Sequence, residues 1–196
     1  MITCEMFKKS VMDAEEKGYG MDYINKRIKC PKRYQDATPE YLDDKLKQWA
    51  NQATQKNLLL YGGVGTGKTY TSFALAKLFY VNKNSIEIYN IVELLNKIKS
   101  FFDKEFAEEN TKAIITDNSI LIIDDFGSEK VTDWSLEFIY RLINTRYEEV
   151  LQTIFISNLN PKELAKVYGD RIVSRIIEMS GESGIIKLEG KDKRLK

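Results

Sequence analysis

The sequence predicts an α/β protein built on a five-stranded parallel sheet. Five short apolar segments alternate along the chain with stretches whose apolar residues recur at helical spacing. Several of these segments are apolar at nearly every position, which is typical of strands covered on both faces. The predicted strands span residues 57–61, 85–89, 119–123, 153–157 and 184–188. In such a sheet, ligands bind outside the carboxyl ends of the strands.

The composition describes a globular protein with a hydrophobic core. Of the 196 residues, 43% are hydrophobic and 30% are charged, and the net charge is +1. A chain of this length fits one domain. Because the net charge is close to zero, any binding of nucleic acid depends on local patches and not on the molecule as a whole.

Several classes of function are excluded by what the chain lacks. It has no histidine, which rules out a histidine base or ligand, and Cys4 and Cys30 are too few for a zinc site. No apolar run reaches the length of a membrane span, and the first residues do not follow the plan of a signal peptide. We therefore expect a cytoplasmic protein with reduced cysteines and no membrane association.

The most informative segment joins the first predicted strand to a helix through a glycine-rich turn. Residues 62–69 read Gly-Gly-Val-Gly-Thr-Gly-Lys-Thr, and the residues that follow have helical spacing. The pattern Gly-x-x-x-x-Gly-Lys-Thr in this context forms a phosphate-binding P-loop. We expect left-handed backbone angles at Gly62, Gly65 and Gly67, which turn N–H groups toward an anion.

Each polar residue of this loop has an expected role. Lys68 supplies a cation for the β- and γ-phosphates, Thr69 supplies a hydroxyl for Mg²⁺, and the following helix adds the positive end of its dipole. The sequence therefore predicts a nucleotide site. The residues assigned to it are Gly62, Gly63, Val64, Gly65, Thr66, Gly67, Lys68, Thr69 and Tyr70.

Two adjacent carboxylates follow the third predicted strand. Asp124 and Asp125 come directly after four aliphatic residues, so we place them at the carboxyl end of a central strand. A P-loop enzyme needs one carboxylate there for Mg²⁺ and another to orient the attacking water. We assign Asp124 to the metal and Asp125 to the water. Asp125 is one methylene shorter than the glutamate of many relatives, so slow hydrolysis is expected.

An amide and three arginines complete the candidate site. Asn158 follows the fourth predicted strand, where it can hold the same water or the γ-phosphate, although alone it would indicate a turn. Arg171 and Arg175 lie one helical turn apart, and Arg194 lies in a basic tail. Such arginines can reach a γ-phosphate from the same or a neighbouring subunit. A solvated helix face and a frayed tail remain the alternatives.

Helices are predicted between the strands. Thr38 and Pro39 begin one that carries Tyr41, Leu42, Leu46, Trp49 and Ala53 on one side. Residues 91–106 are expected to form one long amphipathic helix. Thr132 and Asn160 cap two further helices, Gly169 ends the second of these, and residues 171–179 form the last one.

The first 33 residues are polar and weakly patterned, and we expect a short extension before an ATPase domain that spans residues 34–196. A basic cluster ends this extension. Its members are Lys26, Arg27, Lys29, Lys32 and Arg33. The cluster is either a solvated linker or an arm that docks on a partner or contacts DNA.

With these residues identified, the chain resembles the AAA+ ATPases of the bacterial helicase-loader group DnaC/DnaI, whose near relative is the transposase helper IstB. The resemblance runs from about residue 32 to the C-terminus. Beyond the P-loop, it is carried by Arg-Tyr-Gln-Asp-Ala-Thr at 33–38, Leu-Ile-Ile-Asp-Asp-Phe-Gly-Ser-Glu at 121–129, Thr-Asp-Trp at 132–134, Ser-Asn-Leu at 157–159 and Gly-Asp-Arg-Ile-Val-Ser-Arg at 169–175.

The resemblance implies roles for several of these residues. Asn158 corresponds to sensor 1, Arg171 to the arginine finger and Arg194 to a sensor-2-like residue. The resemblance also implies self-assembly with ATP and Mg²⁺ into a helical or ring oligomer whose pore contacts single-stranded DNA. The positions that match this contact are Phe102, Thr132 and Trp134. Bases stack on aromatic rings, although Phe102 and Trp134 are equally consistent with a core position.

The expected function is that of an ATP-hydrolysing helicase loader, which helps place a hexameric replicative helicase of the DnaB type on single-stranded DNA. About 30 residues precede the ATPase core, where such loaders carry a separate helicase-binding domain, so a short or divergent member is expected. Two alternatives remain. One is an IstB-like helper of a transposase that acts on duplex DNA, and the other is a nucleotide-gated DNA-binding adaptor with negligible hydrolysis.

Overall fold

Five parallel strands form the centre of the fold. The computed structural model describes residues 4–16, 20–51, 57–82, 85–102 and 104–190. Within these residues the sheet has the strand order β2-β3-β4-β1-β5. The strands are β1 (Leu58–Tyr61), β2 (Ile86–Asn90), β3 (Ile120–Asp124), β4 (Thr153–Ser157) and β5 (Ile185–Lys187). The predicted α/β class and all five predicted strands are confirmed.

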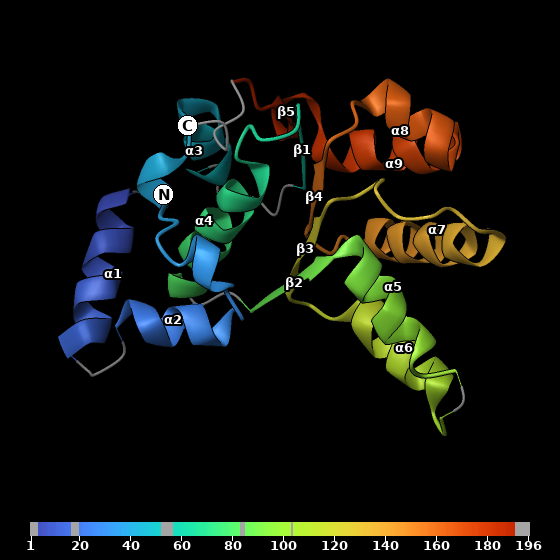
Figure 1. Cartoon of the computed structure of the whole chain (residues 1–196), viewed down its shortest axis with the longest axis horizontal. Coiled ribbons are helices and arrows are strands. Elements are labelled where there is room, and N and C mark those ends of the chain that lie inside the picture. Colours follow the sequence, from blue (N-terminus) through green and yellow to red (C-terminus); the bar gives the residue numbers. More distant parts are fainter. Residues whose placement is uncertain (1–3, 17–19, 52–56, 83–84, 103, 191–196) are drawn as a thin grey trace.

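Helices cover both faces of the sheet (Figure 1). One face carries α1 (Cys4–Glu16), α2 (Met21–Arg27), α3 (Asp44–Asn51) and α4 (Lys68–Val81). The other carries α5 (Ile91–Lys99), α6 (Ala107–Thr116), α7 (Asp133–Glu148), α8 (Pro161–Tyr168) and α9 (Asp170–Ser180). Short 3-10 turns are η1 (Lys32–Tyr34), η2 (Pro39–Tyr41) and η3 (Glu182–Gly184). None of the helices in the described ranges is long and apolar enough to cross a membrane.

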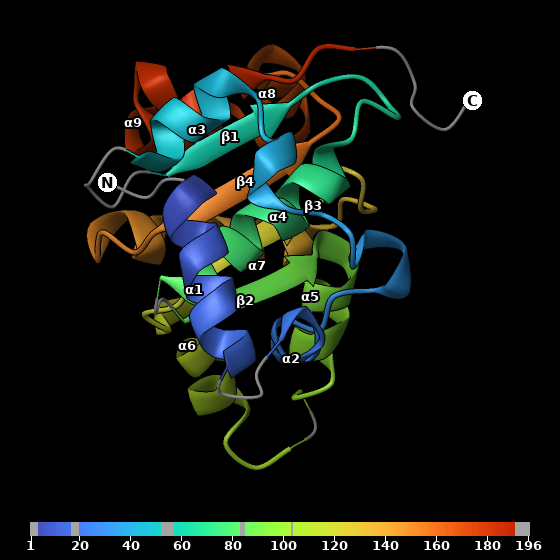
Figure 2. The ribbon, with the colours of Figure 1, turned by 90° about the vertical axis from the view of Figure 1, so that its left-hand side faces the viewer.

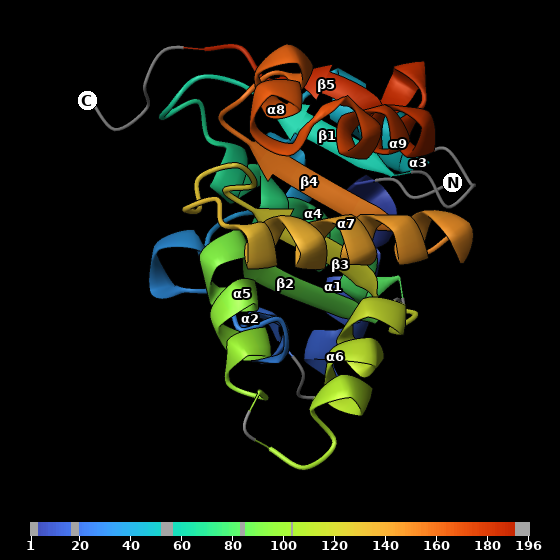
Figure 3. The ribbon, with the colours of Figure 1, turned by 90° about the vertical axis from the view of Figure 1, so that its right-hand side faces the viewer.

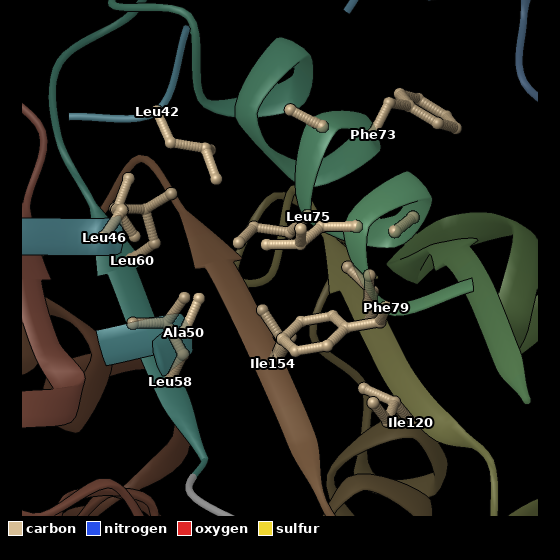
Figure 4. Close-up of a cluster of buried hydrophobic side chains, with 14 of the residues drawn as sticks. Leu42, Leu46, Ala50, Leu58, Leu60, Phe73, Leu75, Phe79, Ile120 and Ile154 are labelled. Atoms are coloured by element: carbon tan, nitrogen blue, oxygen red, sulfur yellow. The ribbon is translucent and has the colours of Figure 1, made fainter. Parts of the chain in front are cut away.

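The alternation of side chains along each strand creates two hydrophobic layers. Leu58 and Leu60 point to the face covered by α4, whereas Leu59 packs on the opposite face with α7 and α9. Figure 4 shows the first layer, in which Leu75 and Phe79 of α4 lie against the aliphatic residues of the strands. Because both of their faces are buried, the central strands β1, β3 and β4 are apolar at most positions and not at every second one.

The N-terminal segment packs on α4. Phe7 of α1 and Ile28, just after α2, are buried in the same layer as α4, and Figure 2 shows α1 in front of α4 and α2 below it. The buried Lys77 of α4 donates hydrogen bonds to the carbonyl oxygens of Tyr34 (3.3 Å) and Gln35 (2.8 Å). The segment that follows α2 is therefore tied to the central helix.

Two predicted helices differ from the structure. Residues 39–41 form only the turn η2, because Leu42 has an extended ψ of 137°, and Tyr41 is 70% exposed. The α-helix begins at Asp44, after Asp43 accepts a hydrogen bond from the N–H of Leu46 (2.8 Å). The predicted start at Thr38 is therefore wrong, and Ala53, which was assigned to the same helix, lies outside the described residues.

The helix predicted over residues 91–106 is also wrong in length. It ends at Lys99, and a separate helix, α6, begins after Phe106, whose φ of 65° is left-handed. Figure 3 shows α5 and α6 as two distinct helices joined by a loop. The aromatic residues after Lys99 continue the helical spacing without continuing the helix.

The other predicted helix boundaries agree with the structure. Thr132 caps α7 in a capping box with Ser135, and Asn160 caps α8 in another with Glu163. Gly169, with a φ of 84°, lies between α8 and α9.

Candidate nucleotide site

The P-loop lies between β1 and α4 at the carboxyl end of the sheet. Gly65 and Gly67 have φ values of 77° and 100°, which favour glycine because a Cβ is strained there. The hydroxyl of Thr66 donates to the carbonyl oxygen of Gly63 (2.9 Å), and Val64 is exposed at the tip. Left-handed angles are thus confirmed for two of the three glycines.

Gly62 differs from that prediction, because its φ is not left-handed. A Cβ at this position would lie 2.3 Å from the carbonyl oxygen of Leu188, just after β5. The N–H of Leu188 in turn donates to the carbonyl oxygen of Tyr61 (2.7 Å). Glycine is needed here because the start of the P-loop lies directly against the end of β5.

Lys68 is buried at the first position of α4 and is only 6% exposed. Its Nζ donates to the carbonyl oxygens of Gly62 (2.8 Å) and Gly63 (2.7 Å). A buried ammonium group needs such acceptors to offset the loss of water. The ammonium group of Lys68 is thus enclosed by the P-loop itself, and phosphate oxygens of a bound nucleotide can replace the two carbonyl acceptors.

Asp124 joins the P-loop to β3. Its carboxylate is 7% exposed and forms hydrogen bonds with the Thr69 side chain and the N–H of Asp125 (2.9 Å). Burial, followed by the charge of Asp125, raises the pKa of Asp124 to about 6, although these hydrogen bonds and Lys68 act in the opposite direction. Thr69 and Asp124, which the sequence assigns to one metal ion, are in contact.

Asp125 is held by a residue that the sequence analysis missed. Its φ of 55° is left-handed, a conformation that aspartate tolerates better than most residues. Its Oδ2 accepts a hydrogen bond from Asn90 Nδ2 (3.1 Å), while Asn90 Oδ1 caps α5 by accepting from the N–H of Val92 (2.9 Å). The signal was present, because Asn90 is a polar residue at the end of an apolar strand, as Asn158 is.

Asn158 lies beside the P-loop. It is exposed, and it lines a hollow of about 560 Å³ together with Gly62 and Gly63. Lys162 and Lys187, which the sequence analysis did not single out, line the same hollow. The structure therefore brings Asn158 to the P-loop.

Tyr70 packs on the segment that precedes α3. Its hydroxyl donates to the carbonyl oxygen of Asp36 (2.9 Å), and its ring meets Tyr41 edge to face at 5.6 Å. Burial and then the charge of Asp36 raise the pKa of Tyr70 to about 12. Tyr70 thus joins the first turn of α4 to the turn η2.

Arg171 and Arg175 face α7 of their own chain and not its P-loop. Arg171, on the first turn of α9, is exposed and stacks over the ring of Tyr140 on α7 at 5.1 Å. Arg175 stacks over the same ring at 5.5 Å. Both side chains thus face α7, and Arg194 lies outside the described residues.

The three residues assigned to DNA gather near the start of α7. Phe102 is 51% exposed and meets Trp134 edge to face at 5.3 Å, and Lys99 lies 4.7 Å above the Trp134 ring. Trp134 also stacks on Phe138 of the core. Thr132 is exposed and caps α7. Phe102 lies beyond the end of α5, not within the helix as predicted.

This fold and site define a P-loop nucleotide-binding protein of the AAA+ class. The strand order, the P-loop after β1 and the carboxylates at the end of β3 are its defining features. The model of the family of IstB-like ATP-binding proteins matches residues 33–196. The chain therefore belongs to this ATP-binding family.

Comparison with known proteins adds two kinds of similarity. The replicative helicase loader DnaI of Bacillus subtilis is 28% identical over 168 residues, which cover 79% of this chain and 53% of DnaI. The crystal structure of the DnaC helicase loader matches with a TM-score of 0.69 and 23% identity, over 81% of this chain and 100% of that one.

The replication initiator DnaA, solved with AMPPCP and single-stranded DNA, matches with a TM-score of 0.65 and 20% identity. That match covers 83% of this chain and 52% of DnaA. At such identities the two structures establish the fold alone. The chain spans about half the length of the curated helicase loaders it matches.

Proposed function

We propose that this chain is an Mg²⁺-dependent ATPase that helps place a replicative hexameric helicase of the DnaB type on single-stranded DNA. One observation carries the ATPase proposal, namely that the P-loop, with its buried Lys68, places Thr69 beside the buried carboxylate of Asp124 at the end of β3. The similarity to proteins named replicative helicase loaders supports the choice of client. We place the protein in the cytoplasm with that client.

The donor set at this point fits Mg²⁺. The ion takes oxygen ligands, and Thr69 and Asp124 offer a hydroxyl and a carboxylate that already touch each other. The raised pKa of Asp124 reflects a buried negative charge that a nearby cation would stabilise. When bound, the ion would neutralise charge on the phosphates, and Lys68 would add a second positive charge there.

Hydrolysis requires a water molecule that attacks the γ-phosphorus as the bond to the leaving ADP oxygen breaks. We assign Asp125 to orienting this water and accepting its proton, and Asn158, which lines the hollow beside the P-loop, to holding the water or the γ-phosphate. The bond from Asn90 fixes the Asp125 carboxylate and occupies one of its oxygens. A carboxylate held in this way is consistent with slow turnover.

Phosphoryl transfer benefits from a second cation near the γ-phosphate, in addition to Lys68. We propose that a neighbouring subunit supplies it. Arg171 stacks on α7 of its own chain and is exposed, so it is available to a second copy. This arrangement makes hydrolysis depend on assembly into a helical or ring oligomer. We assign Arg194 to a sensor-2-like contact with the nucleotide in the same chain.

Single-stranded DNA is assigned to the surface formed by Phe102, Thr132 and Trp134. Phe102 offers an exposed ring, and the cation of Lys99 lies above the neighbouring Trp134. Stacking of a base on such a ring contributes about 1–3 kcal/mol. We retain residues 34–196 as the ATPase domain and residues 1–33 as an extension, which packs on α4.

A loading assay tests the client. The purified chain is mixed with the replicative helicase of its source and with closed circular single-stranded DNA, which a helicase ring cannot thread from an end. We expect ATP and the parent protein to increase the helicase bound to the circles, and Lys68→Ala, which removes the P-loop cation, to abolish the increase. Equal helicase binding with and without the protein would contradict the proposal. Capture of a transposase instead would favour the IstB-like alternative.

The chemistry has a separate test. Asp125→Asn should bind Mg-ATP with the affinity of the parent but lose turnover, because an amide cannot accept the proton from water. Calorimetry measures the binding, and release of phosphate measures the turnover. Parental turnover in Asp125→Asn would place the base elsewhere, and negligible turnover in the parent itself would favour the nucleotide-gated adaptor.

A further inference from the structure

Residues 26–33, which run from the last turn of α2 into η1, carry five basic side chains. We call this segment the basic turn; its cations are Lys26, Arg27, Lys29, Lys32 and Arg33, and all five are exposed. Within the described part of the chain, the ion pairs are made by Lys8, Arg141 and Lys187, and none reaches the basic turn. The cations therefore face solvent without a carboxylate partner there.

Helix chemistry accounts for only part of this charge. Lys26 and Arg27 lie in the last turn of α2, where a cation stabilises the negative end of the helix dipole. Lys29, Lys32 and Arg33 lie beyond the helix and gain nothing from it. Three cations in eight residues thus have no structural explanation.

The backbone at Lys29 is strained. Its φ is 52°, in the left-handed region that a side chain with a Cβ disfavours and that glycine usually occupies after a helix. The turn closes around it, because the N–H of Cys30 donates to the carbonyl oxygen of Asn25 (2.7 Å). A residue that keeps a charge at such a position, where glycine would be more stable, is a candidate for function.

The basic turn is also firmly supported. Ile24 and Ile28, which flank its first half, are buried, and Lys77 of α4 bonds to the carbonyl of Gln35 just after it (2.8 Å). Figures 2 and 3 show the blue segment after α2 protruding on the side of the molecule where the P-loop lies. The charges are therefore presented on a fixed scaffold and not on a loose linker.

We propose that the basic turn binds the phosphate backbone of duplex DNA. Residues 26–33 include no aromatic side chain, and the ring of Tyr34, which follows them, is already stacked on Phe73 of α4 at 5.3 Å. Tyr23, the nearest exposed ring, lies one turn earlier on α2, so the turn itself offers cations for phosphates and no ring for an unpaired base. Duplex DNA supplies the denser row of phosphates and needs no such ring. The inference goes beyond the proposed function, which assigns single-stranded DNA to the surface around Phe102.

The test compares two triple variants of the full chain. In the first, Lys29, Lys32 and Arg33 are replaced by glutamine. The matched control replaces Lys45, Lys112 and Lys166, three exposed lysines on three different helices, in the same way. Binding of a short labelled duplex and of a single strand is measured as a function of salt concentration.

We expect the first variant to bind the duplex on the order of tenfold more weakly and to reduce the salt dependence by about one phosphate contact per residue. The scattered control should change neither quantity by a comparable amount. Phe102→Ala should instead weaken binding of the single strand at an unchanged salt slope, because stacking releases no ions.

Lys29→Gly separates binding from folding. It removes one cation and relaxes the strained backbone, so the melting temperature should rise by about 2–4 °C while duplex affinity falls. Loss of binding through unfolding would give the opposite thermal shift.

Two results would overturn the inference. One is a duplex affinity and salt slope in the first variant equal to those of the scattered control. The other is a loss confined to the single strand, which would make single-stranded DNA the occupant. If Phe102→Ala has no effect on DNA while the first variant does, the aromatic surface of the proposed function fails and the basic turn stands.

Discussion

Asp124 has a carboxylate that is 7% exposed and a pKa raised by burial, and next by Asp125, to about 6. An unfolded aspartate titrates near about 3.9, so the folded state holds this proton more tightly than the unfolded state does. Stability is therefore lost as the pH rises through about 6, by up to about 3 kcal/mol. At neutral pH and with no cation bound, the Asp124 carboxylate therefore destabilises the folded protein.

We predict that Asp124→Asn raises the free energy of unfolding of the nucleotide-free protein by about 1–3 kcal/mol at neutral pH. The difference from the parent should shrink as the pH falls toward 4, where both side chains are neutral. Denaturant unfolding at several pH values measures it. The same variant should lose the Mg²⁺ dependence of nucleotide binding. A stability difference that does not change with pH would show that the carboxylate is not the cause.

Gly62 and Gly63 form a matched pair for a second prediction. An added Cβ would meet the carbonyl oxygen of Leu188 at 2.3 Å from Gly62, but only Thr66 Cγ2 at 3.8 Å from Gly63. Gly62→Ala should therefore destabilise the protein by about 1–3 kcal/mol through overpacking and weaken ATP binding. Gly63→Ala should be close to neutral in stability. Thermal unfolding and calorimetry check both, and equal effects would mean that the contact with β5 does not constrain the loop.

At the scale of elements, the buried side chain of Arg146 links α7 to several other parts of the fold. It lies on the last turn of α7, is 1% exposed and donates five hydrogen bonds. The acceptors are the carbonyl oxygens of Ile115, Asp117, Ser119 and Gln152 and the hydroxyl of Thr153. These bonds tie α7 to the segments that precede β3 and β4, and burial lowers the pKa of Arg146 to about 10.

We predict that Arg146→Met costs more than about 3 kcal/mol, because several buried acceptors lose their donor. The control is Arg141→Met on the same helix. Arg141 makes an exposed ion pair with Glu108, so its loss should cost less than about 1 kcal/mol. Denaturant unfolding compares the two variants. Similar costs would mean that water replaces the lost donor.

The central strands β1, β3 and β4 could be predicted from the sequence because each is a local run of mostly apolar residues covered on both faces, and β2 could be predicted from its alternation of apolar and polar residues. The helices after η2 and β2 could not be delimited in this way. Phe102 continues the apolar spacing of α5 but is 51% exposed, so the pattern there does not report a buried helix face. Pro39 begins a turn of three residues, and the competing cap at Asp43 starts the α-helix instead.

In the candidate site, too, the features set by a short local segment could be predicted, whereas those that depend on distant parts of the chain could not. The P-loop and Asp124 lie within short segments whose spacing carries the chemistry, so they could be predicted from sequence. Asn90 was missed because its role depends on the register of β2 with β3, which sets it opposite Asp124. Gly62 was predicted to need a left-handed backbone angle, which it does not have. Its actual constraint is the close approach of Leu188, which lies more than a hundred residues away along the chain and could not be read from the local sequence.

For the whole molecule, the position of Arg171 leads to a test of assembly. Lys68→Ala removes the P-loop cation but retains Arg171, whereas Arg171→Ala retains nucleotide binding. Each should be inactive alone, and an equal mixture should regain part of the ATPase activity through mixed interfaces. Activity per subunit in the parent should also rise with protein concentration.

Tyr140 provides the control for this test. Its ring supports the Arg171 guanidinium at 5.1 Å, and Tyr140→Phe keeps the ring while Tyr140→Leu removes it. The leucine variant should lower turnover with unchanged ATP affinity, and the phenylalanine variant should not. A mixture that stays inactive, together with a rate per subunit independent of concentration, would rule out action between subunits.

The contact between Gly62 and Leu188 means that the P-loop cannot reach its final structure until β5 has been synthesised. β1 pairs only with β4 and β5, whose residues follow it by roughly a hundred positions or more. On the ribosome, the strand that carries the P-loop therefore emerges long before either neighbour exists. Such distant pairing is slow to form. A nascent chain that ends before β5 should be unable to retain ATP, so nucleotide binding becomes a property that the protein acquires only as its last strand is synthesised.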